Sequence, residues 1–72
     1  MEKQYQISES KFLEAKIALL ANGGEIDGSR FEISGVEGTV SYVGGVLRVN
    51  ITDKPFLASW EMISDKLDEF FS

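Results

Sequence analysis

Residues 39–51 read TVSYVGGVLRVNI and hold the clearest β pattern in the chain. Apolar and polar residues alternate on both sides of Gly44-Gly45, and a glycine pair in this setting favours a two-residue turn with positive φ at both positions. Such a turn places Val43 opposite Val46, and a slip of one residue would mix apolar and polar side chains on both faces. The remaining predicted pairs are Tyr42–Leu47, Ser41–Arg48, Val40–Val49 and Thr39–Asn50. The stretch therefore predicts an antiparallel hairpin with one apolar and one polar face.

The residues before this hairpin continue the alternation and predict one earlier strand. If residues 35–38 form a loop, Ile33 faces Val40 and Phe31 faces Tyr42. The result is a three-stranded antiparallel meander, which is apolar on one side and wet on the other. Its predicted strands are 31–33, 40–42 and 47–51. Its polar face collects Arg30, Glu32, Ser34, Thr39, Ser41, Arg48 and Asn50. Such a face is typical of any exposed sheet, and it is also compatible with binding of a peptide or an anion.

A first helix is predicted over Glu9–Ala21, before the sheet. Ser8 can cap its N-terminus, and Asn22-Gly23-Gly24 can end it, because glycine accepts the left-handed conformation of a helix stop. The predicted inward residues are Phe12, Leu13, Ile17 and Leu20, with Leu19 at the margin. Lys16 lies inside this arc, where a lysine usually covers apolar surface with its stem and keeps its ammonium in water.

A second helix is predicted in residues 53–72, after the sheet. Its apolar residues recur at spacings of three and four, which is the pattern of an amphipathic helix. They are Phe56, Trp60, Ile63, Leu67 and Phe70. Asp53-Lys54-Pro55 is predicted to open the helix, because proline fits the first helical position. Both helices then cover the one apolar face of the sheet in an α+β fold.

Two segments lie outside these elements, and the whole chain, residues 1–72, is predicted as a single domain. Residues 1–7 are compatible with a short extra strand, although a frayed tail that ends in an anchor is favoured. Residues 22–29 are predicted as a loop by composition, with Asp27-Gly28 as a turn. The third predicted strand, Val46–Ile51, lies at an open edge, so the chain is expected to be a monomer or a weak homodimer that pairs through that edge.

The predicted α-β-β-β-α order is similar to that of the double-stranded-RNA-binding domain family. This resemblance covers nearly the whole chain and lies in the order of the elements. The family binds duplex RNA through its first helix, a loop between its first strands and a basic start to its last helix. In this chain the corresponding loop is Gly35-Val36-Glu37-Gly38, and the last helix opens with one lysine, Lys54. No functional residue is carried over from the family.

The composition excludes several classes of function. The chain has no Cys and no His, which removes a zinc site, a thiol nucleophile and a histidine-based triad, and no cofactor site is predicted. The net charge of −5 is concentrated at the two ends: residues 1–29 carry five acids against three lysines, and residues 53–72 carry five against two. A nucleic-acid partner is disfavoured, because its binding depends on clustered Lys and Arg. No apolar run could span a bilayer, so a cytoplasmic protein is expected.

Two candidate interaction surfaces remain. Four acids are predicted on the outer face of the last helix, namely Glu61, Asp65, Asp68 and Glu69. Like charges spaced at i and i+4 cost a few tenths of a kcal/mol, which a surface for a basic partner would explain, although a solvated helix face explains it as well. The second surface is the hairpin tip, where the register turns Val43 and Val46 outward.

The expected function is therefore that of a non-enzymatic protein-interaction or regulatory module with a protein partner. The alternatives are a nucleic-acid-binding domain of double-stranded-RNA-binding-like topology and an acidic inhibitor that mimics nucleic acid. The sequence holds no clear base, nucleophile or metal-ligand set that would point to an enzyme.

Overall fold

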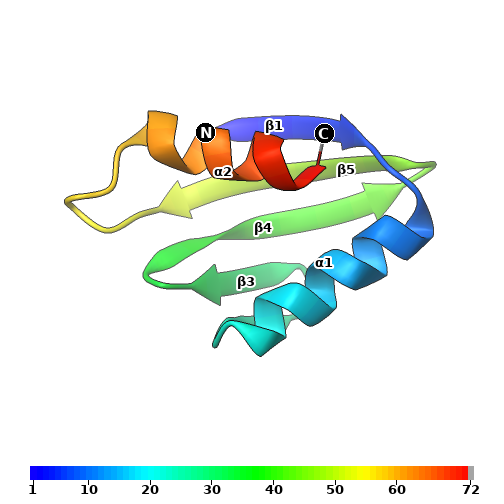
Figure 1. Ribbon diagram of the computed structural model, residues 1–72, viewed down its shortest axis with the longest axis horizontal. Helices are drawn as coiled ribbons and strands as arrows, with labels where there is room; N and C mark the ends of the chain where they lie inside the picture. The colour runs from blue at the N-terminus through cyan, green and yellow to red at the C-terminus, as the bar shows by residue number, and fades with distance from the viewer. Residues whose placement is uncertain (72) are drawn as a thin grey trace.

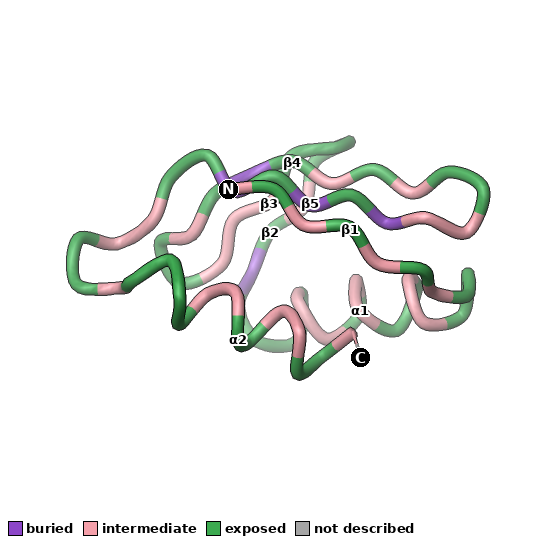
Figure 2. Tube along the Cα trace, turned by 90° about the horizontal axis from the view of Figure 1, so that it is seen from above, coloured by how far each residue is buried: buried purple, intermediate pink, exposed green. Residues whose placement is uncertain are grey.

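The computed structural model describes residues 1–71 as a five-stranded antiparallel sheet with two helices on one of its faces (Figures 1 and 2). The elements in chain order are β1 (Glu2–Gln6), α1 (Glu9–Ala21), β2 (Glu25–Asp27), β3 (Arg30–Ile33), β4 (Val36–Val43), β5 (Val46–Asp53) and α2 (Trp60–Phe71). The strand order across the sheet is β1-β5-β4-β3-β2. The α+β class and the two helices on one face are confirmed, whereas the prediction of three strands is wrong.

The β4–β5 hairpin has the predicted register along the whole of residues 39–50. Val43 pairs with Val46, and Tyr42 pairs with Leu47. The turn residues Gly44 and Gly45 have φ values of 61° and 80°, which side chains other than glycine rarely adopt. The glycine pair therefore sets the turn, and the turn sets the register.

The register between β3 and β4 differs from the prediction by four residues. Ile33 pairs with Val36, and Ser34-Gly35 forms a two-residue turn with φ values of 52° and 82°. Residues 36–38 therefore belong to β4 rather than to a loop. Because four is an even number, Phe31 stays on the apolar face, although its partner is Gly38 and not the predicted Tyr42.

Gly38 lies where β4 is most crowded, at an irregularity in its pairing with β5. A Cβ atom at this position would overlap the carbonyl oxygen of Asn50 and lie 3.0 Å from the ring of Phe31. Glycine is required here by close packing, because its neighbours occupy the space of a side chain. The prediction took this residue as the end of a loop.

Two strands occupy segments that the sequence assigned to irregular structure. β1 pairs with β5 along its whole length, so the favoured interpretation of residues 1–7 as a frayed tail is wrong, and the short extra strand is correct. β2 forms inside the predicted loop of residues 22–29 and pairs with β3. The order is therefore β-α-β-β-β-β-α, which does not match the α-β-β-β-α order of double-stranded-RNA-binding domains. β5 is not an edge strand, so the predicted dimer route through its open edge is closed.

The ends of α1 follow the sequence prediction. The Ser8 side chain accepts a hydrogen bond from the amide of Lys11 at 3.1 Å and caps the first turn. At the other end the amide of Gly24 donates to the carbonyl of Leu19, and that of Gly23 donates to Leu20. With Gly23 at φ 84°, these two bonds form a Schellman motif.

The orientation of α1 about its axis is rotated from the predicted one. Leu13, Ile17 and Leu20, which were predicted to face the core, are 51%, 68% and 54% exposed. Of the predicted inward residues, Phe12 does pack on the core, where its ring stacks on Tyr42 with centroids 4.8 Å apart. Leu19, predicted at the margin, faces the sheet side together with Ala15 and Ala18. The helix is apolar around most of its circumference, so its sequence allowed either orientation.

α2 begins later than predicted. Its first residue is Trp60, and the Ser59 hydroxyl caps it by accepting a hydrogen bond from the amide of Met62 at 3.1 Å. Pro55 lies in a turn before the helix, where its carbonyl accepts a hydrogen bond from Ala58. Phe56, predicted as part of the buried seam, is therefore 95% exposed.

The core is built on β5, where Leu47, Val49 and Ile51 are 1%, 4% and 3% exposed. They share the face that the helices cover, because alternate residues of a strand point to one side. The helices add Phe12 from α1 and Ile63, Leu67 and Phe71 from α2. The predicted apolar face of the sheet is thus the buried one (Figure 2).

Gly38→Ala is expected to lower the free energy of unfolding by about 1–3 kcal/mol, the typical cost of overpacking a core. The added methyl group must displace the Asn50 backbone, which belongs to the strand that carries the core. Gly28→Ala, in the turn between β2 and β3, is the control for a methyl group added without a clash, because nothing lies within 4 Å of its Cβ, although its φ of 59° adds some strain. Urea unfolding monitored by Trp60 fluorescence measures the free energy of unfolding of both variants. A Gly38→Ala variant as stable as the control would contradict the close packing inferred at Gly38.

Candidate functional site

Three of the four predicted acids lie on the outer face of α2. Glu61, Asp65 and Glu69 are exposed and follow one another at i, i+4 spacing. On a helix such residues stand above one another on a single face, so the three carboxylates form a negative stripe. We call these three residues the acidic stripe.

Asp68 does not join the stripe, because its carboxylate contacts side chains of β1. Its carboxylate accepts a hydrogen bond from the hydroxyl of Tyr5 at 2.7 Å and lies 3.0 Å from the ammonium of Lys3. Lys3 also donates to the Ser64 hydroxyl at 3.1 Å. The ring of Tyr5 stacks on Phe71 with centroids 5.1 Å apart. These contacts attach α2 to the edge of the sheet, so Asp68 acts in the fold.

The same contacts shift two pKa values in opposite directions. Burial raises the pKa of Tyr5 above its ordinary value of 10.0, and the hydrogen bond to Asp68 raises it further. The hydrogen bond from Tyr5, followed by that from Lys3, lowers the pKa of Asp68 below its ordinary value of 3.8. Folding therefore favours a neutral phenol beside an ionised carboxylate.

Val43 and Val46 lie at the tip of the β4–β5 hairpin, as the register predicted. They pair directly with each other, and Val43 is 76% exposed while Val46 is half-buried. The tip stands at the far end of the hairpin from the start of α2, so the two predicted surfaces are separate (Figure 1). Two valines make a small contact area, which soluble proteins often expose.

The polar face of the sheet is wider than predicted, because β1 extends it. Glu2, Asn50, Thr39 and Arg30 form one cross-strand row over four strands. Gln4, Arg48 and Ser41 form the next. Both rows mix acceptors, donors and charge, and Glu2 stands at the end of the row that holds Arg30. The face offers no concentrated charge of one sign to select a ligand.

α1 exposes a row of apolar side chains that the sequence predicted to face the core. Leu13, Ile17 and Leu20 lie at spacings of four and three on the outer side of α1 and are each more than half exposed. Glu9 and Glu14 are exposed on the same helix and border this row at helical spacing. We call Leu13, Ile17 and Leu20 the apolar row. The feature of the sequence that could have revealed this row is that α1 carries apolar residues on both faces.

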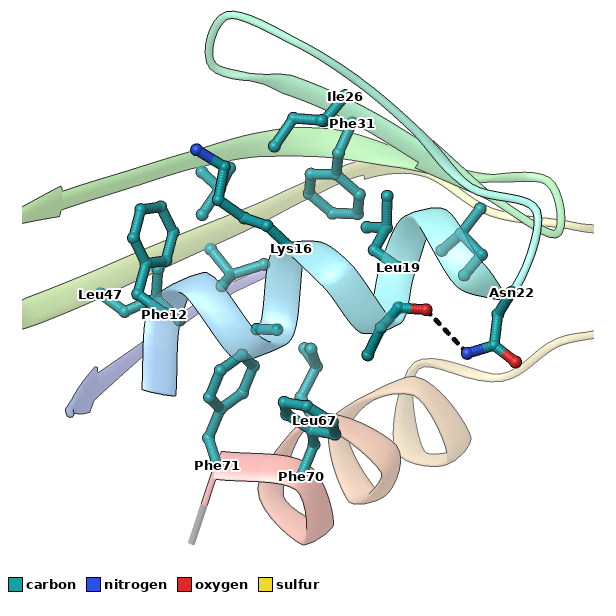
Figure 3. A pocket seen from close by; sticks show the side chains of 15 residues that line it. Phe12, Lys16, Leu19, Asn22, Ile26, Phe31, Leu47, Leu67, Phe70 and Phe71 are labelled. Atoms are coloured by element: carbon teal, nitrogen blue, oxygen red, sulfur yellow. Dashed lines mark hydrogen bonds between the residues drawn. The ribbon is translucent and has the colours of Figure 1, made fainter. Parts of the chain in front are cut away.

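A cavity of about 290 Å³ lies between α1, α2 and the apolar face of the sheet (Figure 3). α1 contributes Phe12, Ala15, Lys16, Ala18 and Leu19, with Asn22 at its end. The sheet contributes Ile26, Phe31, Ile33, Val40, Leu47 and Val49, and α2 contributes Leu67, Phe70 and Phe71. Phe71 extends from α2 toward α1, and Lys16 rises from α1 on the sheet side (Figure 3). The two helices thus stand apart and leave an apolar space between them.

No family model, no curated protein and no solved structure matches the chain. Within residues 1–71 no group of three or more acidic, His or Cys side chains is arranged to hold a metal ion. In the same part of the chain neither helix is long and apolar enough to cross a membrane. The surfaces and the cavity themselves are therefore the basis on which a function can be proposed.

The shifted pKa values predict how stability depends on pH. The Asp68 pKa is lowered by folding, so its contribution is present above the unfolded pKa of about 4 and is lost as the pH falls through the lower folded value. The Tyr5 pKa is raised, so its contribution is present below about pH 10 and is lost at higher pH. Tyr5→Phe is expected to lower the free energy of unfolding at pH 7. It is also expected to make this free energy decline less steeply at both acidic and alkaline pH.

Urea unfolding between pH 2 and pH 11 measures this profile, with Tyr42→Phe as the matched control. The Tyr42 hydroxyl donates to the carbonyl of Ile7 at 2.8 Å, so this variant loses a hydrogen bond but no contact with Asp68. A Tyr5→Phe profile that parallels that of Tyr42→Phe would contradict the role given to Asp68.

Proposed function

We propose that this chain is a non-enzymatic protein-binding module, and that its apolar row on α1 docks a basic amphipathic segment of another protein. The observation that carries the proposal is the exposure of Leu13, Ile17 and Leu20, at 51%, 68% and 54%, along one side of a regular helix. A helix that is apolar around most of its circumference is typical of one that is covered on both sides. The sheet and the cavity account for one side of α1, and a partner accounts for the other.

The charges around the row specify the chemistry of the partner. Glu9 and Glu14 border the apolar row on α1, and the acidic stripe adds three carboxylates on the neighbouring helix. The whole chain carries a net charge of −5. A partner segment with an apolar face flanked by Lys or Arg matches both features, because apolar side chains cover the row while cations face the acids. A second copy of the chain would bring the same negative charge and is disfavoured.

The energetic scale suits a reversible contact. Covering three half-exposed side chains contributes roughly 1 kcal/mol each, since complete burial of such a side chain contributes about 1.5–3 kcal/mol. The carboxylates add mainly to the rate of association and to selectivity, and salt weakens their effect.

The first test titrates a helical peptide of about 14 residues, made of Leu and Lys with leucine at helical spacing, into the protein and measures the dissociation constant and amide shifts. We expect the variant Leu13→Ser/Ile17→Ser/Leu20→Ser to bind at least about tenfold more weakly. The matched control is Phe56→Ser/Leu57→Ser, which removes two apolar side chains that are 95% and 90% exposed on the preceding loop. All these residues are exposed, so the variants are expected to fold.

Equal binding by the wild type and the α1 variant would overturn the proposal, as would an equal loss in the control. Salt-sensitive binding of duplex RNA that survives the α1 substitutions would also overturn it and favour nucleic acid. Sedimentation at several protein concentrations tests whether a second copy of the chain binds the apolar row. Self-association that the α1 substitutions abolish would show that the partner is a second copy and would overturn the proposal.

The acidic stripe gives a separate prediction. Glu61→Ser/Asp65→Ser/Glu69→Ser is expected to slow association with the basic peptide about two- to tenfold at low salt and to change little at 0.5 M salt, because screening removes a long-range field. Asp68 is left unchanged, since it holds α2 on β1. Stopped-flow mixing at two salt concentrations measures this, and Glu25→Ser/Asp27→Ser/Glu37→Ser, which removes three exposed acids from the sheet, is the control for net charge. A salt-independent loss of rate would contradict electrostatic attraction by the stripe.

A further inference from the structure

We propose that the cavity between the helices and the sheet binds a small apolar carboxylate, with its apolar body inside the cavity and its anionic group toward Lys16 (Figure 3). The ligand class is an aliphatic or aromatic acid with one negative charge. This site lies on the opposite side of α1 from the apolar row and does not depend on the protein-binding proposal.

The size of the cavity defines the size of the ligand. Its volume of about 290 Å³ is close to the lower end of small-molecule sites, which begin at about 300 Å³. A dry apolar cavity of about 150 Å³ accommodates one benzene ring, so this one has room for a body of two rings or about eight to ten carbons. Water fills such a space poorly, because it needs two to four polar partners.

The lining defines the chemistry of the ligand body. It consists of aliphatic side chains and four phenylalanine rings, from Phe12, Phe31, Phe70 and Phe71, and its polar side chains are Lys16 and Asn22. The Asn22 amide already donates to the carbonyl of Ala18 at 2.7 Å in closing the end of α1 (Figure 3). The interior therefore offers apolar contact and one cation.

The charges at the cavity favour an anion over a neutral ligand. Although acids outnumber bases by 12 to 7 in the chain, no carboxylate is among the described residues of the lining. The Lys16 ammonium lies 5.1 Å from the centre of the Phe12 ring, and that of Lys11 lies 4.3 Å from the centre of the Phe70 ring. Both rings belong to the cavity wall. Within residues 1–71 neither ammonium forms an ion pair, so both leave positive charge available to a ligand.

The arrangement also explains why a lysine lies on the inner side of α1. Lys16 lines the wall and is half-buried, and the four-carbon stem of a lysine allows its ammonium to keep part of its water at the cavity margin. A carboxylate at this margin gains a partly desolvated ion pair, and its apolar body displaces poorly bonded water from the cavity. A small hydrophilic anion such as acetate can form the ion pair, but it has no apolar body to fill the cavity and therefore gains only the first contribution.

The test uses octanoate and, as the matched neutral probe, octan-1-ol. Each is titrated into ¹⁵N-labelled protein, and amide shifts give the dissociation constant and the location. We expect saturable binding of octanoate with the largest shifts in the lining, and weaker binding of octanol. Lys16→Met is expected to weaken octanoate binding about fivefold and to leave octanol binding nearly unchanged. Lys66→Met, at an exposed position on α2 outside the lining, is the control for charge.

Two substitutions test the cavity itself. Ala15→Leu places a larger side chain in the wall and is expected to abolish octanoate binding while keeping or raising the thermal midpoint, because it fills empty space. Ala18→Met is the second blocking variant if the first distorts α1. Ala21→Leu, at an exposed position of the same helix, is the control and should bind normally. The Leu13→Ser/Ile17→Ser/Leu20→Ser variant should also bind octanoate, which separates this site from the apolar row.

The proposal is overturned if octanoate shows no saturable binding up to about 10 mM, or if folded blocking variants bind it like the wild type. Equal affinity for octanol and octanoate, or an unchanged octanoate affinity in Lys16→Met, overturns the preference for an anion. Shifts confined to the polar face of the sheet would place the ligand elsewhere and likewise overturn it.

Discussion

Pairing of β5 on both sides is the constraint on which the rest of the structure depends. β4 and β1 flank this strand, and the three most buried residues, Leu47, Val49 and Ile51, all belong to it. α2 reaches this core through Ile63, Leu67 and Phe71, and the contacts of Asp68 with Lys3 and Tyr5 fix the helix to β1. β1 therefore both closes the edge of β5 and supplies the polar attachment of α2.

α1 adds one side chain, Phe12, to the core, whereas α2 adds three. The Phe12 ring stacks on Tyr42, and toward its C-terminal end α1 borders the cavity. The helix thus packs loosely on one side and exposes Leu13, Ile17 and Leu20 on the other. A chain of 72 residues needs most of its apolar side chains for its core. Apolar surface on both sides of one helix is therefore best explained by contacts with other molecules. The proposed partner and the proposed ligand use opposite sides of this helix.

Sequence reasoning succeeded where one local signal permitted one answer. Gly44-Gly45 allowed a single turn, and the alternation around it allowed a single register. It failed at Ser34-Gly35, because a serine at φ 52° is uncommon and the sequence offered Gly38 as a second apparent loop residue. The prediction for α1 failed because a helix with apolar residues on all sides has no preferred inner face. The prediction for Asp68 failed because its partners, Lys3 and Tyr5, lie in a strand more than 60 residues away in the sequence. The apolar row was consequently assigned to the core, and the cavity, which depends on helix placement, had no local signal.

The distribution of charge links the two proposed sites. Acids are exposed on the outer surfaces of both helices, while the inner side of α1 carries lysines over aromatic rings and no carboxylate. Net charge alone would not produce this separation, because a uniform acidic surface would serve solubility equally well. The outer surface is complementary to cations and the inner one to an anion, so a basic protein segment and an apolar acid would not compete for the same groups. Each would also contact α1, on opposite sides of the same helix.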